Sequence, residues 1–421
     1  MAARSRFHGA LVVLLVVGTV AGMVGPTHAA GPTSYASLDG SATSDDIDGP
    51  SSPSDVDGAH AQVAGSFEER TFEGRDYLAY VPSGPAPEGG YPVVVMLHGC
   101  DQTPRGFDDA TGMSRVAEEE GFVVVYPDQR PQDNAFECWN WFQPDNYARG
   151  AGEARLIAGM TWDAIQHYET DRNRVYIAGI SSGGAMATNL AGEYPDLYAA
   201  VGSHSGLEYH AVEDPNGAIG AQQSGGIDPA DRAQKAYRRA GDDARPIPAI
   251  VFQGTGDAQV NKVNGNQTAA WAIHLADLAS DGSDDGDIDT DPETVESATT
   301  DGGMTYRRFS YALEGTTMVE FYRLDGARHG WSGGNASVDY TIPEGPDATR
   351  RMWDFFADHA HPNPTFDGPA ASPTTAAPTP TATDTPATPT ATPTETTTAQ
   401  PGTEPPSETP TDAPITESPT T

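Results

Sequence analysis

Residues 175–186 constrain the fold more than any other stretch, because they predict a buried strand, an abrupt turn and the start of a helix. The turn holds Ser181 between Gly179 and the pair Gly183 and Gly184, in the pattern GxSxG. Glycine has no Cβ, so it tolerates a strained backbone and the close approach of neighbouring chain. The pattern therefore predicts that the Ser181 hydroxyl stands exposed where a strand passes into a helix.

Strands and helices alternate along the middle of the chain. Apolar runs rich in β-branched and aromatic residues predict strands, and stretches of helical period lie between several of them. The predicted strands are 77–81, 91–97, 122–126, 174–178, 198–201, 247–252, 304–311 and 317–324, and the predicted helices are 114–120, 152–168, 185–191 and 348–359. This alternation favours an α/β fold with a mostly parallel central sheet and helices on both faces. An exposed serine at a strand-to-helix turn of such a sheet is typical of the α/β-hydrolase fold.

Composition divides the 421 residues into four parts. Residues 1–29 place arginines before an apolar run and small residues after it, which predicts a secretory signal peptide rather than a membrane span, and hence an extracellular protein. Residues 30–65 are rich in Ser, Asp and Gly and predict a disordered spacer. Residues 66–361 have the apolar patterning of one α/β-hydrolase domain, interrupted by an acidic insertion at 276–303. Residues 362–421 are dominated by Pro and Thr and predict a disordered tail.

The charge balance excludes one class of partner. The chain has 60 acidic and 23 basic residues, and its formal net charge at pH 7 is −37. So negative a protein is unsuited to bind nucleic acid, which is itself a polyanion. The acids are spread through the domain, which predicts a halophilic protein whose surface repulsion is screened by concentrated salt. The polar segment 215–245, like the insertion at 276–303, predicts an irregular surface excursion.

Ser181 needs two partners to act as a nucleophile. A serine hydroxyl is activated by a histidine base, which a carboxylate holds in the required tautomer. In the α/β-hydrolase fold the acid follows the serine in the chain, and the histidine follows the acid. Asp257 comes shortly after the strand 247–252, and His329 comes shortly after the strand 317–324. We therefore predict Ser181, Asp257 and His329 as the catalytic residues, since the other histidines after Ser181 lie mostly in helices, insertions or the approach to the tail.

Two backbone N–H groups are expected to stabilise the oxyanion. One belongs to Ser182, the residue after the nucleophile, and the other to Cys100, which follows His-Gly at the end of the strand 91–97. Cys100 and Cys138 are the only cysteines, and in an exported protein such a pair is predicted to form a disulfide. The bridge would fix the oxyanion loop against the aromatic stretch 139–142.

Aromatic residues near these motifs suggest a substrate groove. Trp139, Trp141 and Trp331 are predicted to contact the substrate, and plain core packing is the alternative for them. The cysteines lack the spacing of metal ligands and the histidines are dispersed, so neither a metal nor a cofactor is expected.

Four separated motifs resemble the secreted polyhydroxybutyrate depolymerase family of esterases, whose relatives include feruloyl and acetylxylan esterases. They are HGCDQ at 98–102, CWNWF at 138–142, GISSGGAM at 179–186 and HGWSGG at 329–334. The resemblance covers about residues 67–361. It implies Ser181 as the nucleophile, Asp257 as the acid, His329 as the base and a bridge between Cys100 and Cys138.

Two features depart from the family pattern. Gln253 stands where the family typically has a histidine before the acid loop, and the 421 residues end in the Thr-rich segment, whereas many extracellular members carry a granule-binding domain beyond such a linker. The resemblance implies a secreted, monomeric serine esterase that hydrolyses short-chain polyhydroxyalkanoate polyester or its oligomers through an acyl-enzyme. A feruloyl or acetylxylan esterase acting on polysaccharide is the alternative with the same triad. A non-catalytic surface or adhesion protein is the alternative of another class.

Overall fold

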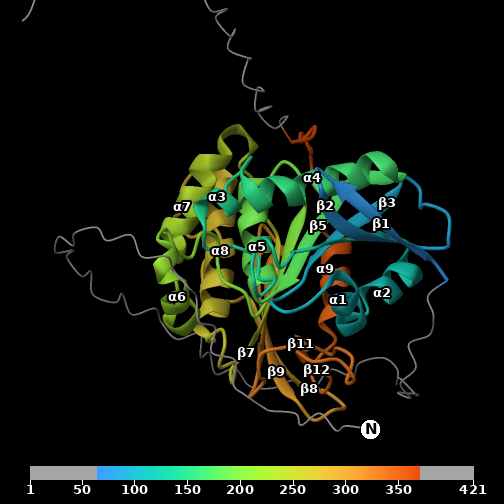
Figure 1. Cartoon of the computed structure of the whole chain (residues 1–421). Coiled ribbons are helices and arrows are strands. Elements are labelled where there is room, and N and C mark those ends of the chain that lie inside the picture. Colours follow the sequence, from blue (N-terminus) through green and yellow to red (C-terminus); the bar gives the residue numbers. More distant parts are fainter. Residues whose placement is uncertain (1–63, 370–421) are drawn as a thin grey trace, which may run out of the picture. The chain divides into compact units, whose positions relative to one another are not determined.

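The computed structural model describes residues 64–369 (Figure 1). The predicted signal peptide lies outside the described residues, as do nearly all of the predicted spacer and most of the predicted tail. No helix between residues 64 and 369 combines the length and the hydropathy that crossing a membrane requires.

In the described part of the chain, ten strands form the main sheet in the order β1-β2-β4-β3-β5-β6-β7-β10-β9-β8. These strands are β1 Ser66–Phe72, β2 Arg75–Val81, β3 Tyr91–Leu97, β4 Val123–Pro127, β5 Thr170–Ile180, β6 Ala200–His204, β7 Ala249–Gly254, β8 Thr294–Thr299, β9 Thr305–Leu313 and β10 Thr316–Leu324. Neighbours from β4 to β10 are parallel, and both edges of the sheet are antiparallel. A short pair, β11 Trp331–Ser332 and β12 Thr341–Ile342, lies apart from the main sheet. This architecture confirms the predicted α/β fold.

Helices cover both faces of the sheet, because parallel strands need crossover connections. The helices are α1 Pro104–Thr111, α2 Met113–Glu120, α3 Pro144–Tyr147, α4 Gly152–His167, α5 Ser182–Glu193, α6 Ala218–Ser224, α7 Pro229–Ala240, α8 Val263–Asp281 and α9 Ala348–Ala357, with 3₁₀ turns η1 Pro215–Gly217 and η2 Gly241–Asp243. Successive side chains of β3 point to opposite faces of the sheet and therefore pack in two different hydrophobic cores. Val93 and Val95 lie in a core shared with α4, α5 and α8, whereas Val94 and Met96 lie in a core shared with α2 and α9.

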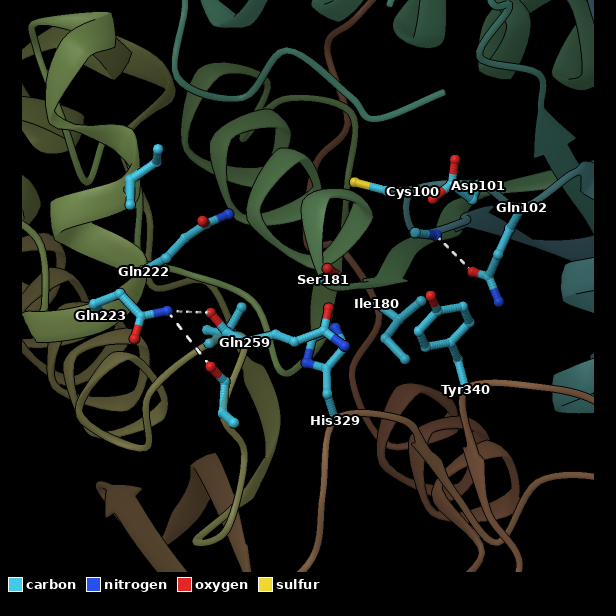
Figure 2. Close-up of a pocket in the computed structure, with 14 residues that line it drawn as sticks. Cys100, Asp101, Gln102, Ile180, Ser181, Gln222, Gln223, Gln259, His329 and Tyr340 are labelled. Atoms are coloured by element: carbon cyan, nitrogen blue, oxygen red, sulfur yellow. Dashed lines mark hydrogen bonds between the residues drawn. The ribbon is translucent and has the colours of Figure 1, made fainter. Parts of the chain in front are cut away.

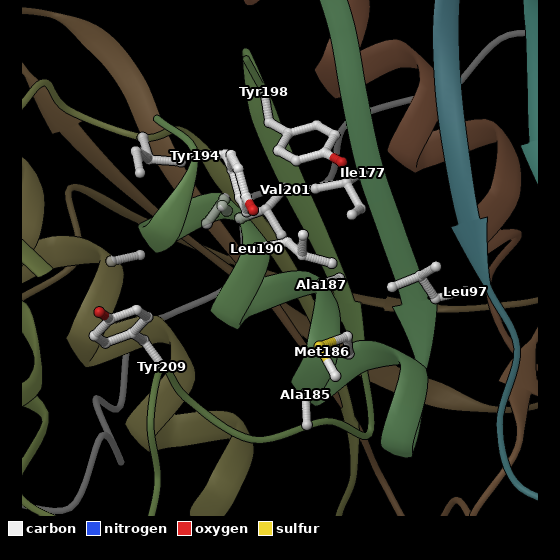
Figure 3. Close-up of a cluster of buried hydrophobic side chains, with 14 of the residues drawn as sticks. Leu97, Ile177, Ala185, Met186, Ala187, Leu190, Tyr194, Tyr198, Val201 and Tyr209 are labelled. Carbon is white, nitrogen blue, oxygen red and sulfur yellow. The ribbon is translucent and has the colours of Figure 1, made fainter. Parts of the chain in front are cut away.

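Helix α5 lies at the centre of the larger core. All of its residues are buried, and Figure 3 shows Met186 and Leu190 among the side chains that fill the space between α5 and the sheet, near Ile177 of β5. The start of the helix touches β3 backbone to backbone, since a Cβ added at Gly183 would come within 2.1 Å of the Leu97 carbonyl oxygen. Glycine at this position therefore holds the end of β3 against the start of α5.

Both polar segments are more ordered than the sequence predicts. The segment 215–245 contains α6 and α7, and α7 buries small residues such as Ala233 and Ala236 that leave a weak apolar signal. The segment 276–303 contains the last residues of α8 and the strand β8. Helix α8 is buried around most of its circumference, so no polar face marks its period, and β8 is an exposed edge strand without apolar alternation.

Carboxylates gather at the end of α8 and in the loop that follows. Oxygens of Asp277, Asp285 and Asp287 lie within 4.8 Å of one another. Desolvation and the negative charges of Asp281, Asp287 and Asp277 raise the pKa of Asp285. Repulsion among these carboxylates therefore adds to the repulsion that the net negative charge of the whole chain creates.

We expect the unfolding temperature to rise between dilute buffer and molar potassium chloride. The screening length falls from about 10 Å at 0.1 M salt to about 3 Å at 1 M, which weakens repulsion between neighbouring carboxylates. Thermal unfolding followed by circular dichroism across a salt series measures the effect. A flat or falling profile would contradict the halophilic interpretation.

The folded domain continues past the boundary predicted at residue 361. Phe366 is buried, and its ring packs edge-on against Trp162 and Tyr194 with centroid distances of 5.7 Å in both cases. The backbone N–H groups of Thr365 and Phe366 donate to the Asp196 carbonyl. The packing of Phe366 thus holds against the domain a segment that composition alone assigns to the disordered tail.

Replacing Phe366 with alanine is expected to lower the free energy of unfolding by about 3 kcal/mol, because it removes a buried ring from between two others. Urea unfolding followed by tryptophan fluorescence measures the change. Phe136, which is 37% exposed, provides the matched control, and F136A should alter stability by no more than about 0.5 kcal/mol. Equal midpoints for F366A and F136A would show that the segment is not fastened in solution.

Candidate active site

Ser181 stands at the turn between β5 and α5. Its backbone angles are φ 57° and ψ −122°, a conformation that is costly for a residue with a side chain. Gly179 and Gly183 make the turn possible, since a Cβ at Gly179 would lie 2.5 Å from the Gly183 carbonyl carbon. The Ser181 N–H donates to the His204 carbonyl of β6 at 2.9 Å, which holds the turn against the sheet.

Ser181 and His329 line one pocket of about 340 Å³ (Figure 2). The pocket lies where β3, β5, β7 and β10 end, as expected for a parallel sheet. Its lining residues are Gly99, Cys100, Asp101, Gln102, Ile180, Ser181, Ile219, Gln222, Gln223, Ala258, Gln259, Val260, His329 and Tyr340. The Ser181 hydroxyl has no hydrogen-bond partner among the described residues, and catalytic contacts of this kind often tighten only when substrate binds.

Asp257 forms a hydrogen bond with His329 at the pocket. The Nδ1 atom of His329 lies 2.7 Å from Oδ2 of Asp257, and both side chains are buried. A carboxylate accepts, so the imidazole proton resides on Nδ1 and Nε2 keeps its lone pair. His329 is therefore in the tautomer that a general base requires.

The Asp257 carboxylate is stabilised in its ionised form. Burial alone would raise its pKa, but the hydrogen bond from His329 and the N–H groups of Val260 and Gln259 outweigh burial and lower the pKa. Those two N–H groups lie 2.8 and 2.9 Å from Oδ1. The Gln253 amide adds a longer contact of 3.4 Å to Oδ2 and donates to the Val260 carbonyl. Gln253, which departs from the family pattern, thus helps to hold the loop that carries Asp257.

The side chains of Cys100 and Ser182 are in contact beside Ser181. The Cys100 Sγ atom lies 3.5 Å from the Ser182 hydroxyl oxygen. Neither residue's backbone N–H has a hydrogen-bond acceptor within residues 64–369. The predicted disulfide between Cys100 and Cys138 is present, with a Cα separation of 4.2 Å. Two free N–H groups beside Ser181 are what an oxyanion hole needs.

The three tryptophans predicted to contact substrate do not line this pocket. Trp139, Trp141 and Trp331 are at most 3% exposed. The Trp139 indole donates to the His98 carbonyl, and the Trp331 indole donates to the Thr349 hydroxyl. Trp139 and Trp141 belong to one hydrophobic core and Trp331 to the other, so their burial favours core packing over the groove interpretation.

Sequence reasoning missed the wall of the pocket. Ile219, Gln222 and Gln223 come from α6, which lies in the segment predicted to be irregular. Tyr340 comes from the loop before β12. Polar residues on a short helix leave no pattern by which the sequence could have placed them.

Two buried histidines hydrogen-bond to backbone N–H groups of loops near the pocket. His204 accepts from the Ser332 N–H at 3.0 Å, three residues beyond His329, and His98 accepts from the Gln129 N–H at 3.2 Å. Burial lowers the pKa of His204 to about 3 and that of His98 to about 4. Both rings are therefore neutral at pH 7.

A second hollow of about 380 Å³ adjoins the first and shares Ala258, Gln259, His329 and Tyr340 with it. It is lined by Gly256, Ala258, Gln259, Arg328, His329, Asp339 and Tyr340. His329 borders both spaces, so a substrate lying across it would have one part in each. Among its described lining residues the first space has Asp101 but no lysine or arginine, whereas the second has both Arg328 and Asp339.

The sheet topology and the placement of Ser181 at its carboxyl edge define an α/β-hydrolase. Comparison with known families is more specific, since the profile described as "Esterase PHB depolymerase" matches residues 75–286. The chain belongs to this family. The match includes Ser181 and Asp257 and ends before His329.

Curated relatives agree with this family. The chain is 32% identical over 255 residues to "Poly(3-hydroxyalkanoate) depolymerase C" of Paucimonas lemoignei, covering 60% of this chain and 57% of the relative. It is 34% identical over 119 residues to "Feruloyl esterase B" of Thermothelomyces thermophilus, covering 28% of this chain and 40% of the relative. The chain thus spans about half the length of these relatives. The solved "Acetyl xylan esterase from Aspergillus awamori" has the same fold, with a TM-score of 0.54 at 19% identity over 70% of this chain and 100% of that one.

Proposed function

We propose that this protein is a secreted serine esterase that hydrolyses short-chain polyhydroxyalkanoate polyester, or its soluble oligomers, through an acyl-enzyme. The observation that carries the proposal is the 2.7 Å hydrogen bond between His329 and buried Asp257 at the pocket that holds Ser181. Membership of the depolymerase family and the name of the relative from Paucimonas lemoignei support the choice of ester.

The chemistry follows from the geometry. Ser181 Oγ attacks the ester carbonyl while His329 Nε2 takes its proton, and the Asp257 carboxylate stabilises the resulting imidazolium. The N–H groups of Cys100 and Ser182 stabilise the tetrahedral oxyanion. When the intermediate collapses, His329 returns the proton to the departing alkoxide and an acyl-Ser181 ester remains. Water then attacks this ester with His329 again as base, which releases the acid and restores the serine hydroxyl.

The described lining of the pocket has no lysine or arginine, and the carboxylate of Asp101 would repel an anion, so it suits an uncharged acyl group. Its glutamines offer neutral hydrogen bonds, and Ile219 adds an apolar contact at 47% exposure. A chain of ester units presents carbonyl acceptors and short aliphatic groups, which match such a wall. The leaving alcohol belongs on the His329 side, because that residue protonates it.

The second hollow supports one alternative. Arg328, Asp339 and Tyr340 make it polar, and a sugar alcohol presents many hydroxyl groups to such a surface. A carbohydrate esterase that removes acetyl or feruloyl groups would use the same triad with a saccharide in this space.

A panel of esters in molar salt tests the proposal. The substrates are p-nitrophenyl acetate, 3-hydroxybutyrate oligomers, polyhydroxybutyrate film, methyl ferulate and acetylated xylan. Release of 3-hydroxybutyrate at a higher kcat/KM than that for either plant-wall ester supports the polyester assignment. A preference for acetylated xylan or methyl ferulate selects the alternative, and no turnover of any ester by intact protein rejects the esterase function.

A further inference from the structure

The loop that carries the Cys100 N–H is held by side chains from within its own motif. The N–H of Gly99 donates to the side-chain oxygen of Gln102 at 2.8 Å (Figure 2). The carbonyl of Gly99 lies 2.7 Å from Nδ1 of buried His98. Because His98 Nε2 accepts from the Gln129 N–H, its proton is on Nδ1 and is donated to Gly99. Both polar groups of Gly99 are therefore taken.

The next residue along is also fixed. The Asp101 N–H donates to the Phe136 carbonyl at 2.8 Å, and Asp101 itself has φ 56°. Of the three consecutive N–H groups from Gly99 to Asp101, the one of Cys100 alone lacks an acceptor in the described part of the chain. The loop thus leaves one donor free, and Cys100 lines the pocket that holds Ser181.

We infer that Gln102 is a positioning residue of the oxyanion hole, a role that rests on the proposed esterase function. Its side-chain oxygen satisfies the Gly99 N–H, and so directs the following peptide to present the Cys100 N–H to the oxyanion. Gly99 lies close to the nucleophile, since a Cβ added there would be 3.1 Å from that Gln102 oxygen and 3.4 Å from the Ser181 Cβ. A shift of the loop would therefore change the geometry at the reacting carbonyl.

The inference predicts a specific kinetic signature. Methionine has nearly the length of glutamine but is a poor acceptor, so Q102M should leave Gly99 unsatisfied. We expect kcat for p-nitrophenyl acetate to fall by about 10- to 100-fold, since small misplacements of catalytic groups have effects of this size. KM should stay within about twofold, because an interaction strengthened only in the transition state affects kcat.

Phenylboronic acid supplies a second readout. It forms a tetrahedral adduct with an active serine, so its inhibition constant for Q102M should rise by about the same factor as kcat falls. Gln143 is the matched control: it bonds to Asn140 and Asn146 and does not line the pocket. Q143M should match wild type in kcat and in boronate inhibition within about twofold. Wild-type protein without esterase activity would instead refute the proposed function.

Several outcomes would overturn the role of Gln102. These are a kcat for Q102M within twofold of wild type, or a lower kcat with unchanged boronate inhibition, or a loss confined to KM. If Q102M does not fold, Q102E and Q102K make the comparison. Glutamate keeps an acceptor for Gly99 and lysine offers only donors, so kcat should be about tenfold higher for Q102E. Charge alone predicts the opposite order, because a cation would favour the oxyanion, so a higher kcat for Q102K also overturns the inference.

Discussion

Replacing Ser181 with alanine is expected to lower kcat for p-nitrophenyl acetate by on the order of a millionfold, because the nucleophile, base and acid act as one unit. The fold should survive, since the change removes a single oxygen that has no hydrogen-bond partner among the described residues. Stopped-flow or long-time assays, with the protein at high concentration, measure the residual rate. Circular dichroism confirms the fold.

A serine outside the pocket provides the control for this variant. Ser310 lies on β9, and S310A should keep kcat within about twofold of wild type. Near wild-type turnover by S181A would show that another residue is the nucleophile.

Asp257 is expected to be almost as sensitive. D257N should lower kcat by about 10⁴-fold, because an amide can donate to His329 Nδ1 and so favours the wrong imidazole tautomer. The lowered pKa of Asp257 means that the carboxylate stays ionised at neutral pH, so the wild-type enzyme should not lose this support between pH 5 and 8. A pH series of kcat for wild type and D257N measures both effects.

Asp242, in the 3₁₀ turn η2, is the matched control for this substitution. D242N should retain wild-type kcat within about twofold. If D242N is impaired more than D257N, a different carboxylate orients the base.

The parts of the site that could be predicted are those tied to strand ends. Ser181 follows β5, Asp257 follows β7 and His329 follows β10, and the parallel sheet brings those ends to one edge. The sequence order of acid and base in this fold then identifies them. Buried strands carry a strong apolar signal, which explains why eight of the ten strands described in the main sheet are predicted. The edge strands β1 and β8 have no buried residue and carry no such signal.

The other parts of the site and of the fold depend on side-chain packing, which composition does not determine. Trp141 and Trp331 lie in or beside the sequence motifs of the site. The sequence does not distinguish an aromatic residue that faces a groove from one that is buried in a core. Helix α7 buries alanine rather than leucine or valine, so its segment was predicted to be irregular. Phe366 is a single apolar residue in a Pro- and Thr-rich stretch, and one residue sets no period.

Gln253 shows both what the sequence can predict about the site and what it cannot. The sequence marks it as a departure from the family pattern, but its role is visible only in three dimensions. Its amide donates to the Val260 carbonyl at 3.1 Å and lies 3.4 Å from the Asp257 carboxylate. A neutral amide therefore supports the acid loop without adding a titrating group beside the triad.

The Cys100–Cys138 disulfide makes the stability of the fold depend on the redox state of the surrounding compartment. In a reducing environment the two thiols are not joined, and without a bridge across this sequence separation of 38 the fold is less stable relative to the unfolded chain by about 4 kcal/mol in the chain-entropy description. The hydrogen bonds that Gln102, His98 and Asp101 make around the Cys100 loop do not need the bridge, so its loss would lower the stability of the whole fold. The proportion of folded chains would therefore be higher where an oxidant keeps the bridge closed.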